Sequence, residues 1–241
     1  MPKLLIDGDA ASLDALRLVL GQHTTMTARY LTEQEEVHFP LLPSGAAYLP
    51  PADLPHWCVL PATPHVTKPP ASPQRNEHLI LATDGSSQGN PGPCGMAVVV
   101  SDRHNPERIT VAHGWGHPGP HTNNQVELTA VLSALNYALS RYPRTAEIRT
   151  DSQYVCNNLP KFEGRARSGT LDITKNADLW RALIRAKQAV EEVGIDLTVS
   201  WVKGHAGDLN NERADKIAVK SRKELKYIRQ EFSQNPNASV D

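Results

Sequence analysis

Four acidic residues of this 241-residue chain stand at positions where carboxylates can gather around a cation. Asp84 and Asp151 each follow a short strand-like run, LILAT and EIRT. Glu127 falls in the first turn of an expected helix, and Asp215 lies in the last expected helix. Each of the four, taken alone, is more simply explained as a helix cap, a turn residue or a surface charge.

Acids that end buried strands need a partner, because they have little water around them. No lysine or arginine adjoins Asp84 in the sequence. Several carboxylates in one place repel one another unless a divalent cation neutralises them. Ligands that are all oxygen indicate Mg²⁺ or Mn²⁺ rather than zinc. Two such ions suit phosphodiester hydrolysis, because one activates water and the other stabilises the leaving oxygen.

The segments that must position these acids show alternating strand and helix patterns. Strands are expected at 78–85, 95–102, 108–116, 146–152 and 195–204. Helices are expected at 123–142, 152–159, 176–194 and 210–232. The first three strands predict an antiparallel meander, and the whole order predicts an α/β fold, a mixed sheet with helices on its faces.

A proline-rich stretch divides the chain. Residues 61–73 contain five prolines and no periodic apolar pattern, which is typical of an extended linker. We therefore expect a small N-terminal α/β domain at 1–60, a linker at 61–76, a catalytic domain at 77–230 and a disordered tail at 231–241. The first of these matches no recognised family, and its role is left open between protein interaction, stability and dimerisation.

Composition excludes several classes of protein. Hydrophobic residues make up 39% and charged residues 21%, which fits neither a disordered chain nor a membrane protein. The acids in the segment MPKLLIDGDAASLD argue against a signal peptide. The three cysteines form no CxxC pair, which argues against a disulfide scaffold and a structural zinc site and favours the cytoplasm.

The net charge of −1 hides local basic stretches. Residues 157–190 hold 7 basic and 3 acidic residues, and residues 220–229 hold 5 basic residues and one acid. A nearly neutral protein can therefore still present a surface that attracts a polyanion.

Four segments resemble type 1 ribonuclease H and occur in the same order along the chain, over about residues 78–220. They are TDGSSQGNPGPCG, TNNQVEL, TDSQYV and WVKGHAGDLNNERAD. The resemblance implies a mixed five-stranded sheet and an endonuclease that cuts the RNA strand of RNA–DNA hybrids, leaving a 5′-phosphate. It also implies that the metal ligands, for two Mg²⁺ ions with Mn²⁺ as the alternative, are Asp84, Glu127, Asp151 and Asp215.

His205 matches the catalytic loop histidine of that family. It lies between Gly204 and Gly207, which permit a mobile loop, and an imidazole with a pKa near neutrality can relay a proton. Without the surrounding motif, it would be interpreted as a solvent-exposed loop histidine.

Polar side chains beside the acids are candidates for substrate contact. The resemblance implies that Ser87 and Asn90 contact the hybrid. Asn123, Asn124 and Gln153 offer amide groups that can bond 2′-hydroxyls and minor-groove edges. The alternative for Asn123 is that it only caps the helix that follows it.

The basic residues between 161 and 187 correspond to a handle that grips the DNA strand in many members of the family. This chain keeps the KNxDLW pattern but lacks the tryptophan run and the dense lysine cluster, so we expect a weaker grip. For the basic C-terminal helix, phosphate binding and plain solubility are both left open.

Two other functions are weighed against a hybrid nuclease. A non-catalytic binding module is disfavoured because all four acids and His205 are present, and an integrase or resolvase is disfavoured by the amide groups beside the acids. The expected partner is an RNA–DNA hybrid, with no membrane. The protein is expected to be a monomer whose N-terminal domain is a possible protein-interaction module.

Overall fold

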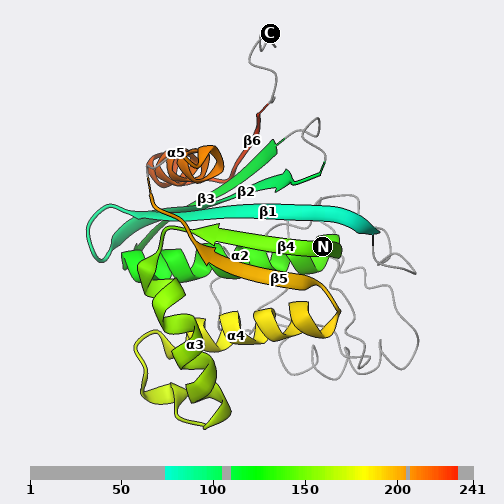
Figure 1. Ribbon diagram of the computed structural model, residues 1–241. Helices are drawn as coiled ribbons and strands as arrows, with labels where there is room; N and C mark the ends of the chain where they lie inside the picture. The colour runs from blue at the N-terminus through cyan, green and yellow to red at the C-terminus, as the bar shows by residue number, and fades with distance from the viewer. Residues whose placement is uncertain (1–73, 105–109, 205–206, 233–241) are drawn as a thin grey trace, which may run out of the picture.

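The computed structural model describes residues 74–104, 110–204 and 207–232 (Figure 1). The small N-terminal domain expected at 1–60 lies outside the described residues, as do most of the linker and His205. The expected three-strand meander opens the described part, and the helices and strands follow in the predicted order.

One mixed sheet of six strands forms the centre of the fold, in the order β5-β4-β1-β2-β3-β6. β1, β2 and β3 are antiparallel, β4 and β5 continue the sheet in parallel with β1, and β6 pairs antiparallel with β3. The mixed α/β sheet is thus confirmed. The strands are β1 (Gln74–Ser87), β2 (Gly92–Asp102), β3 (Thr110–His121), β4 (Pro143–Thr150), β5 (Asp196–Trp201) and β6 (Ile228–Phe232).

The sixth strand corrects the expectation of five. The segment expected to be one helix over 210–232 divides into α5 (Leu209–Glu224) and β6, because Leu225 adopts a left-handed conformation at φ 49° that ends the helix. β6 alternates buried and exposed residues, as a strand must, and its Ile228 is buried. β6 also includes the first two residues of the expected tail, just as β1 includes the last residues of the expected linker.

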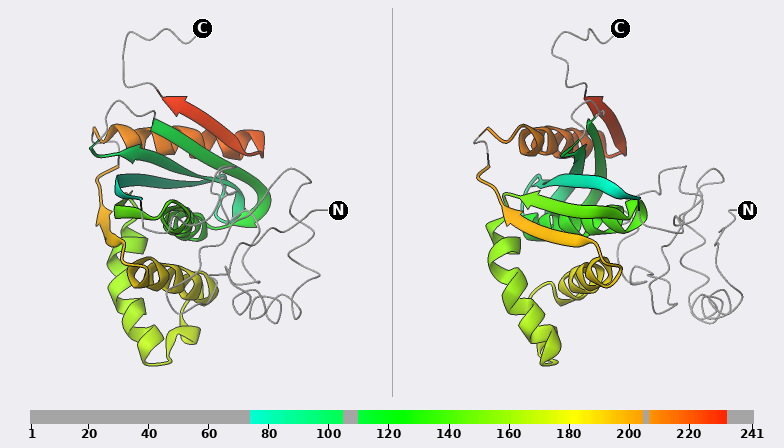
Figure 2. Two further views of the ribbon diagram at one scale, coloured as in Figure 1. Left: turned by 90° about the vertical axis from the view of Figure 1, so that its right-hand side faces the viewer. Right: turned by 45° about the vertical axis from the view of Figure 1, so that its right-hand side comes forward.

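Helices cover both faces of the sheet (Figure 2). Val98 on β2 contributes to the larger core with α2 and α4, whereas its neighbours Ala97 and Val99 contribute to a smaller core with α5. This alternation places β2 between two apolar layers, which explains its nearly continuous apolar sequence. The remaining helices are α2 (Asn123–Arg141), α3 (Gln153–Arg167), the short 3₁₀ helix η2 (Leu171–Ile173) and α4 (Ala177–Glu192).

The helix α5 lies directly on the strands because glycines face it. A Cβ atom on Gly95 would collide with the carbonyl oxygen of Ala218, and one on Gly116 would collide with that of Ser221. Small residues on α5, among them Ala214 and Ala218, complete this close approach. The position of α5 above the sheet is therefore set by backbone contact, which matters because α5 carries Asp215.

Candidate active site

Asp84 and Asp151 meet because β1 and β4 are parallel neighbours. Thr83 is paired with Thr150, so the two acids follow a matched pair of residues in the same direction. Asp84 is only 7% exposed, whereas Asp151 is half-buried. The sheet register therefore produces the juxtaposition that the sequence pattern predicted.

Glu127 joins this pair from the first turns of α2. Asp84, Glu127 and Asp151 each offer a carboxylate oxygen, and these oxygens all lie within 4.8 Å of one another. Gly85 makes this possible, because a Cβ atom there would lie 2.9 Å from the backbone nitrogen of Glu127. A larger residue would push α2 away from β1 and would separate the three acids.

Asp215 approaches the same cluster from α5. Its charge and a side-chain hydrogen bond both act on Asp84, which places its carboxyl beside that residue. It is not part of the three-carboxylate group itself. The structure thus brings all four predicted acids to one place, and Asp215 joins the cluster by its interaction with Asp84.

The electrostatics of the cluster are those of uncompensated anions. Burial, followed by the charges of Asp151 and Asp215, raises the pKa of Asp84 from 3.8 to about 8. The pKa of Glu127 is raised well above its usual value by burial and then by the charges of Asp84 and Asp151. The Oε2 atom of Glu127 is buried without a hydrogen-bond partner. Such a cluster fits a divalent cation, which would neutralise the carboxylates and use the unpartnered oxygen.

Three contacts hold Asp151. The amide Nδ2 of Asn211 donates to its Oδ2 at 3.3 Å, and the indole Nε1 of Trp201 donates to its carbonyl oxygen at 3.1 Å. Gly204 packs against its carboxylate so closely that a Cβ there would lie 2.6 Å from Oδ2. The sequence motifs did not single out Asn211 as a functional residue. The sequence feature that could have identified Asn211 is its position four residues before Asp215, because this spacing puts both side chains on one face of a helix.

The family of the chain follows from a comparison with known proteins. A family model described as RNase H matches residues 76–223, which include all four acids. The chain belongs to the ribonuclease H family. It is 43% identical over 151 residues to the ribonuclease H of Saccharopolyspora erythraea, covering 61% of this chain and 91% of that protein. It is 40% identical over 153 residues to that of Hyphomonas neptunium, covering 61% and 94%.

Solved structures agree with the fold of this ribonuclease H. LC9-RNase H1, a type 1 RNase H with the type 2 active-site motif, superposes with a TM-score of 0.54 at 24% identity, covering 68% of this chain and 81% of that one. The PFV RNase H domain gives a TM-score of 0.51 at 23% identity, covering 61% and 96%. The family match and the relatives named ribonuclease H make the chain an endoribonuclease of this family, and residues 1–75 precede the matched region.

Three of the predicted substrate residues of this ribonuclease H lie together at the start of α2. The hydroxyl of Ser87 donates to Oδ1 of Asn123 at 3.5 Å, and the backbone N–H of Asn123 donates to Oδ1 of Asn90 at 3.2 Å. Thr122, and not Asn123, caps α2, so the capping alternative for Asn123 is wrong. Among the remaining candidates, Asn124 is half-buried in the first turn of α2 and Gln153 is exposed at the start of α3.

The basic handle of this ribonuclease H is partly neutralised. Arg181 pairs with Asp172 and Asp178, and Lys187 pairs with two glutamates. The guanidinium of Arg165 packs over the ring of Phe162, 5.3 Å from its centre. Exposed basic residues that form no ion pair with another described residue are Lys161, Arg167, Lys175 and Arg185. Part of the positive charge of this segment is thus held in ion pairs, and the weaker grip stays a prediction.

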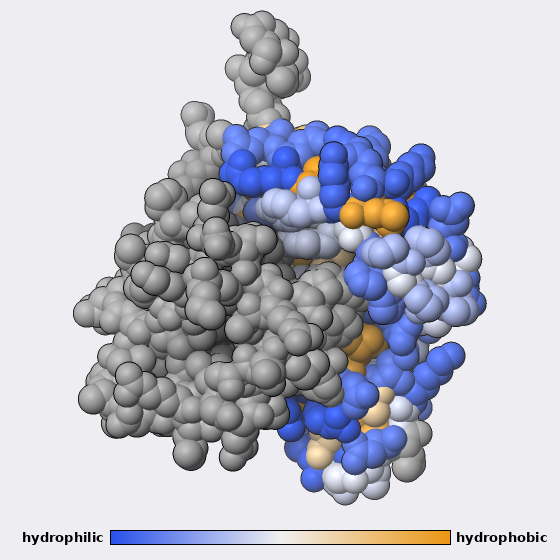
Figure 3. Space-filling model, turned by 180° about the vertical axis from the view of Figure 1, so that it is seen from behind, coloured by the Kyte–Doolittle hydropathy of each residue, from blue (hydrophilic) through white to orange (hydrophobic). Residues whose placement is uncertain are grey.

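No helix among the described residues of this ribonuclease H is long and apolar enough to span a membrane. Seen from behind, the described surface is mostly hydrophilic, with hydrophobic residues in small separate patches (Figure 3). The described part of this face therefore shows no large apolar area of the kind that marks many stable protein interfaces.

Proposed function

We propose that this ribonuclease H hydrolyses the RNA strand of RNA–DNA hybrids and leaves a 5′-phosphate on the product. The observation that supports this most strongly is the buried cluster of Asp84, Glu127 and Asp151, with Asp215 beside it. Its raised pKa values and the unpartnered oxygen of Glu127 describe a site that requires positive charge. A polyanion with a hydrolysable phosphodiester is the substrate that such a site serves.

The four acids are proposed to hold two divalent cations, Mg²⁺ or alternatively Mn²⁺. Carboxylate oxygens are the ligands that both ions prefer. When bound, the cations supply water activation and charge stabilisation of the leaving oxygen. The chain itself holds the carboxylates in place: Gly85 brings Glu127 to Asp84, and Asn211 orients Asp151.

Residues around the cluster are proposed to select and orient the hybrid. Ser87, Asn90 and Asn123 form one polar surface next to Glu127. Asn124 at the start of α2 and Gln153 at the start of α3 offer further amide groups close in sequence to Glu127 and Asp151. Such groups bond 2′-hydroxyls and base edges in the shallow minor groove with little dependence on sequence, which distinguishes RNA from DNA.

His205 is proposed to carry the proton transfer. The described residues on either side of it lie near the cluster, since the N–H of Val202 donates to the carbonyl of Thr150 at 2.9 Å and Asp208 caps α5. A histidine in this loop can take a proton from water or give one to the leaving oxygen.

The protein is further proposed to act as a monomer in the cytoplasm, with residues 1–60 as a protein-interaction module. Burial raises the pKa of the Cys94 thiol to about 11, which keeps this cysteine protonated and unreactive.

The test is a cleavage assay on RNA–DNA, RNA–RNA and DNA–DNA duplexes of one sequence, each with Mg²⁺, Mn²⁺ or a chelator. Cleavage of only the RNA strand, only in the hybrid and only with a cation, is expected. Asp151→Asn serves as the matched inactive control. Equal cleavage of the DNA–DNA duplex, or full activity in the chelator, would refute the proposal.

A further inference from the structure

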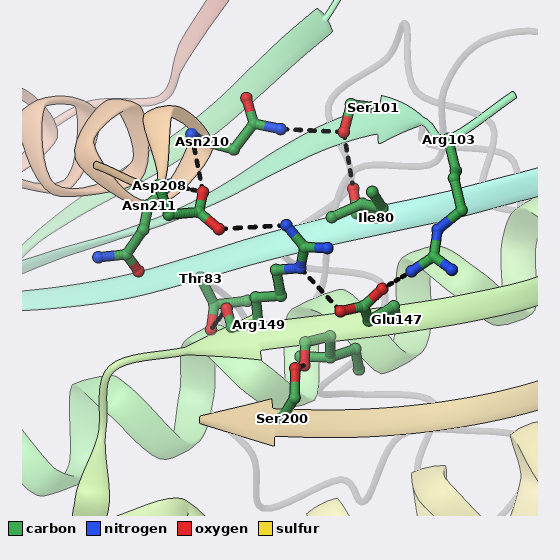
Figure 4. Close-up of polar contacts among 11 residues, drawn as sticks. Ile80, Thr83, Ser101, Arg103, Glu147, Arg149, Ser200, Asp208, Asn210 and Asn211 are labelled. Atoms are coloured by element: carbon green, nitrogen blue, oxygen red, sulfur yellow. Dashed lines mark hydrogen bonds and ion pairs between the residues drawn. The ribbon is translucent and has the colours of Figure 1, made fainter. Parts of the chain in front are cut away.

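A polar network joins the end of β4 to the start of α5 (Figure 4). Its centre is the guanidinium of Arg149, two residues before Asp151. Nη1 of Arg149 donates to Oδ2 of Asp208 at 3.1 Å, and Nε donates to Oε1 of Glu147 at 2.8 Å. All three side chains are only 20–27% exposed, so these ion pairs are less screened by water than ordinary surface pairs.

The carboxylate of Asp208 has two functions. While Oδ2 binds Arg149, Oδ1 accepts hydrogen bonds from the backbone N–H groups of Asn210 at 3.0 Å and Asn211 at 3.1 Å. Asp208 is thus the N-cap of α5, where a negative charge is also favoured by the helix dipole. One side chain therefore both starts the helix and connects it to β4.

The helix that starts here carries two residues of the active site. Asn211 is 2% exposed and donates to Asp151, and Asp215 follows one turn later on the same face. The contacts form a closed circuit from Arg149 through Asp208 and Asn211 to Asp151, and the backbone of β4 completes it. A shift of the first turn of α5 would therefore move both residues relative to Asp151.

A second hydrogen bond holds the first turn of α5 to another strand of the sheet, β2. The amide of Asn210 donates to the hydroxyl of Ser101 on β2 at 3.0 Å. This hydrogen bond fixes the distance of the turn from β2 but makes no contact with β4. The Arg149–Asp208 pair is the ionic contact among the described residues that sets the turn against the strand bearing Asp151.

We propose that the Arg149–Asp208 ion pair is a positioning element of the active site, which sets the first turn of α5 against the end of β4 and thereby the affinity of the acids for their cation. The inference rests on the proposed divalent-cation site. Removing the pair loosens Asn211 and Asp215 without removing any ligand. The expected effect is weaker cation binding, with substrate affinity unchanged.

Asp208→Asn and Arg149→Gln each remove the ion pair, and they test whether the pair sets cation affinity or only stabilises the fold. Asp208→Asn keeps the carbonyl oxygen that caps α5 and loses only the ion pair. Arg149→Lys keeps the charge but cannot bridge two carboxylates as a guanidinium does. Arg103→Gln is the matched control, because Arg103 binds Glu147 at the outer end of the network and does not touch Asp208.

The experiment titrates Mn²⁺ into each substrate-free protein by calorimetry and measures kcat and KM across a Mg²⁺ series. We expect each disrupting single variant to bind the cation roughly 10-fold more weakly, the lower end of the effect of supporting residues in metal sites. The double variant should lose no more affinity than either single one. Arg149→Lys should recover part of the affinity, Arg103→Gln should match the wild type, and KM for the hybrid should be unchanged.

The proposal is overturned if the folded Asp208→Asn or Arg149→Gln protein binds Mn²⁺ as the wild type does, or if the effects of the two substitutions add. A fall in melting temperature with unchanged cation affinity would assign the pair to fold stability alone. Because calorimetry needs no hybrid, the outcome stands even if the wild type fails to cleave hybrids, which would refute the proposed function separately.

Discussion

Replacing Asp84 with asparagine should make the cation-free protein more stable at pH 8 while abolishing cleavage. The folded protein holds the pKa of Asp84 at about 8, against 3.8 for an ordinary aspartate. Between these values the folded state keeps a proton that the unfolded chain has released. The free energy of unfolding of the wild type therefore falls as pH rises, by about 1.4 kcal/mol per pH unit for this one group.

The size of the effect follows from the same two pKa values. From pH 5 to pH 8 the wild type should become about 4 kcal/mol less stable through Asp84, because protonation is nearly complete at pH 5 and half complete at pH 8. For a domain of this size, that corresponds to roughly 10 °C in melting temperature. Asp84→Asn is neutral at every pH and should lack this decrease, so the two proteins should differ little at pH 5 and most at pH 8.

The assay is thermal unfolding followed by circular dichroism at pH 5, 6.5 and 8 in a chelator. Asp196→Asn, which removes an exposed acid at the start of β5, is the control and should follow the wild type. Excess Mg²⁺ at pH 8 should raise the melting temperature of the wild type more than that of Asp84→Asn, because a cation that binds only the folded site stabilises it. Binding of a hybrid by Asp84→Asn should survive.

The reasoning would be refuted if the melting temperatures of the wild type and of Asp84→Asn changed equally with pH. Equal changes would mean that Asp84 is ionised in the folded protein without a penalty, and hence that the acids are not a site of uncompensated charge. Cleavage near the wild-type rate by Asp84→Asn in Mg²⁺ would contradict its assignment as a ligand.

Three further outcomes are expected. His205→Ala should slow turnover by about 10²–10⁴-fold without abolishing it, as is usual when a proton relay is removed, and a pH–rate profile equal to that of the wild type over pH 6–9 would exclude the role. A protein lacking residues 1–73 should remain folded and active, since every described strand and helix follows them; insolubility of the truncated protein would contradict this. Replacing Arg167 and Lys175 by alanine should raise KM for the hybrid and leave kcat unchanged. It should also flatten the slope of log affinity against log salt between 50 and 200 mM, by somewhat under one unit for each phosphate that is no longer neutralised. An unaltered slope would mean that these residues do not contact phosphates and would make α5 the candidate for DNA binding.

The strands that carry the acids could be predicted because their sequences have one clear pattern. The antiparallel meander and the strand before Asp151 are runs of apolar residues that end at turn residues or acids. β6 could not be predicted, because its IRQEF segment continues a basic, helix-like sequence without a glycine or proline. The helix ends instead at Leu225, which adopts a left-handed conformation that its residue type does not favour, and β6 then pairs with β3.

The four acids could be predicted from motifs, but the residues that support them required the structure. Gly85 and Gly204 look like ordinary turn glycines, and their importance is the backbone and carboxylate packed against them. Thr122 and Asn123 are both good helix caps by residue type, and the geometry of the capping box with Gln125 decides between them.

The location of Asp215 on α5 has a consequence for how the enzyme is made. The region up to Asp151 already contains three of the four acids, Asp84, Glu127 and Asp151. It still lacks Asp215, Asn211 and the helix that covers the glycines of β2 and β3. The contact of Asn211 with Asp151 spans 60 residues, so it requires the chain to have been made as far as α5. The cluster of four acids is therefore complete only once α5 has docked on the sheet.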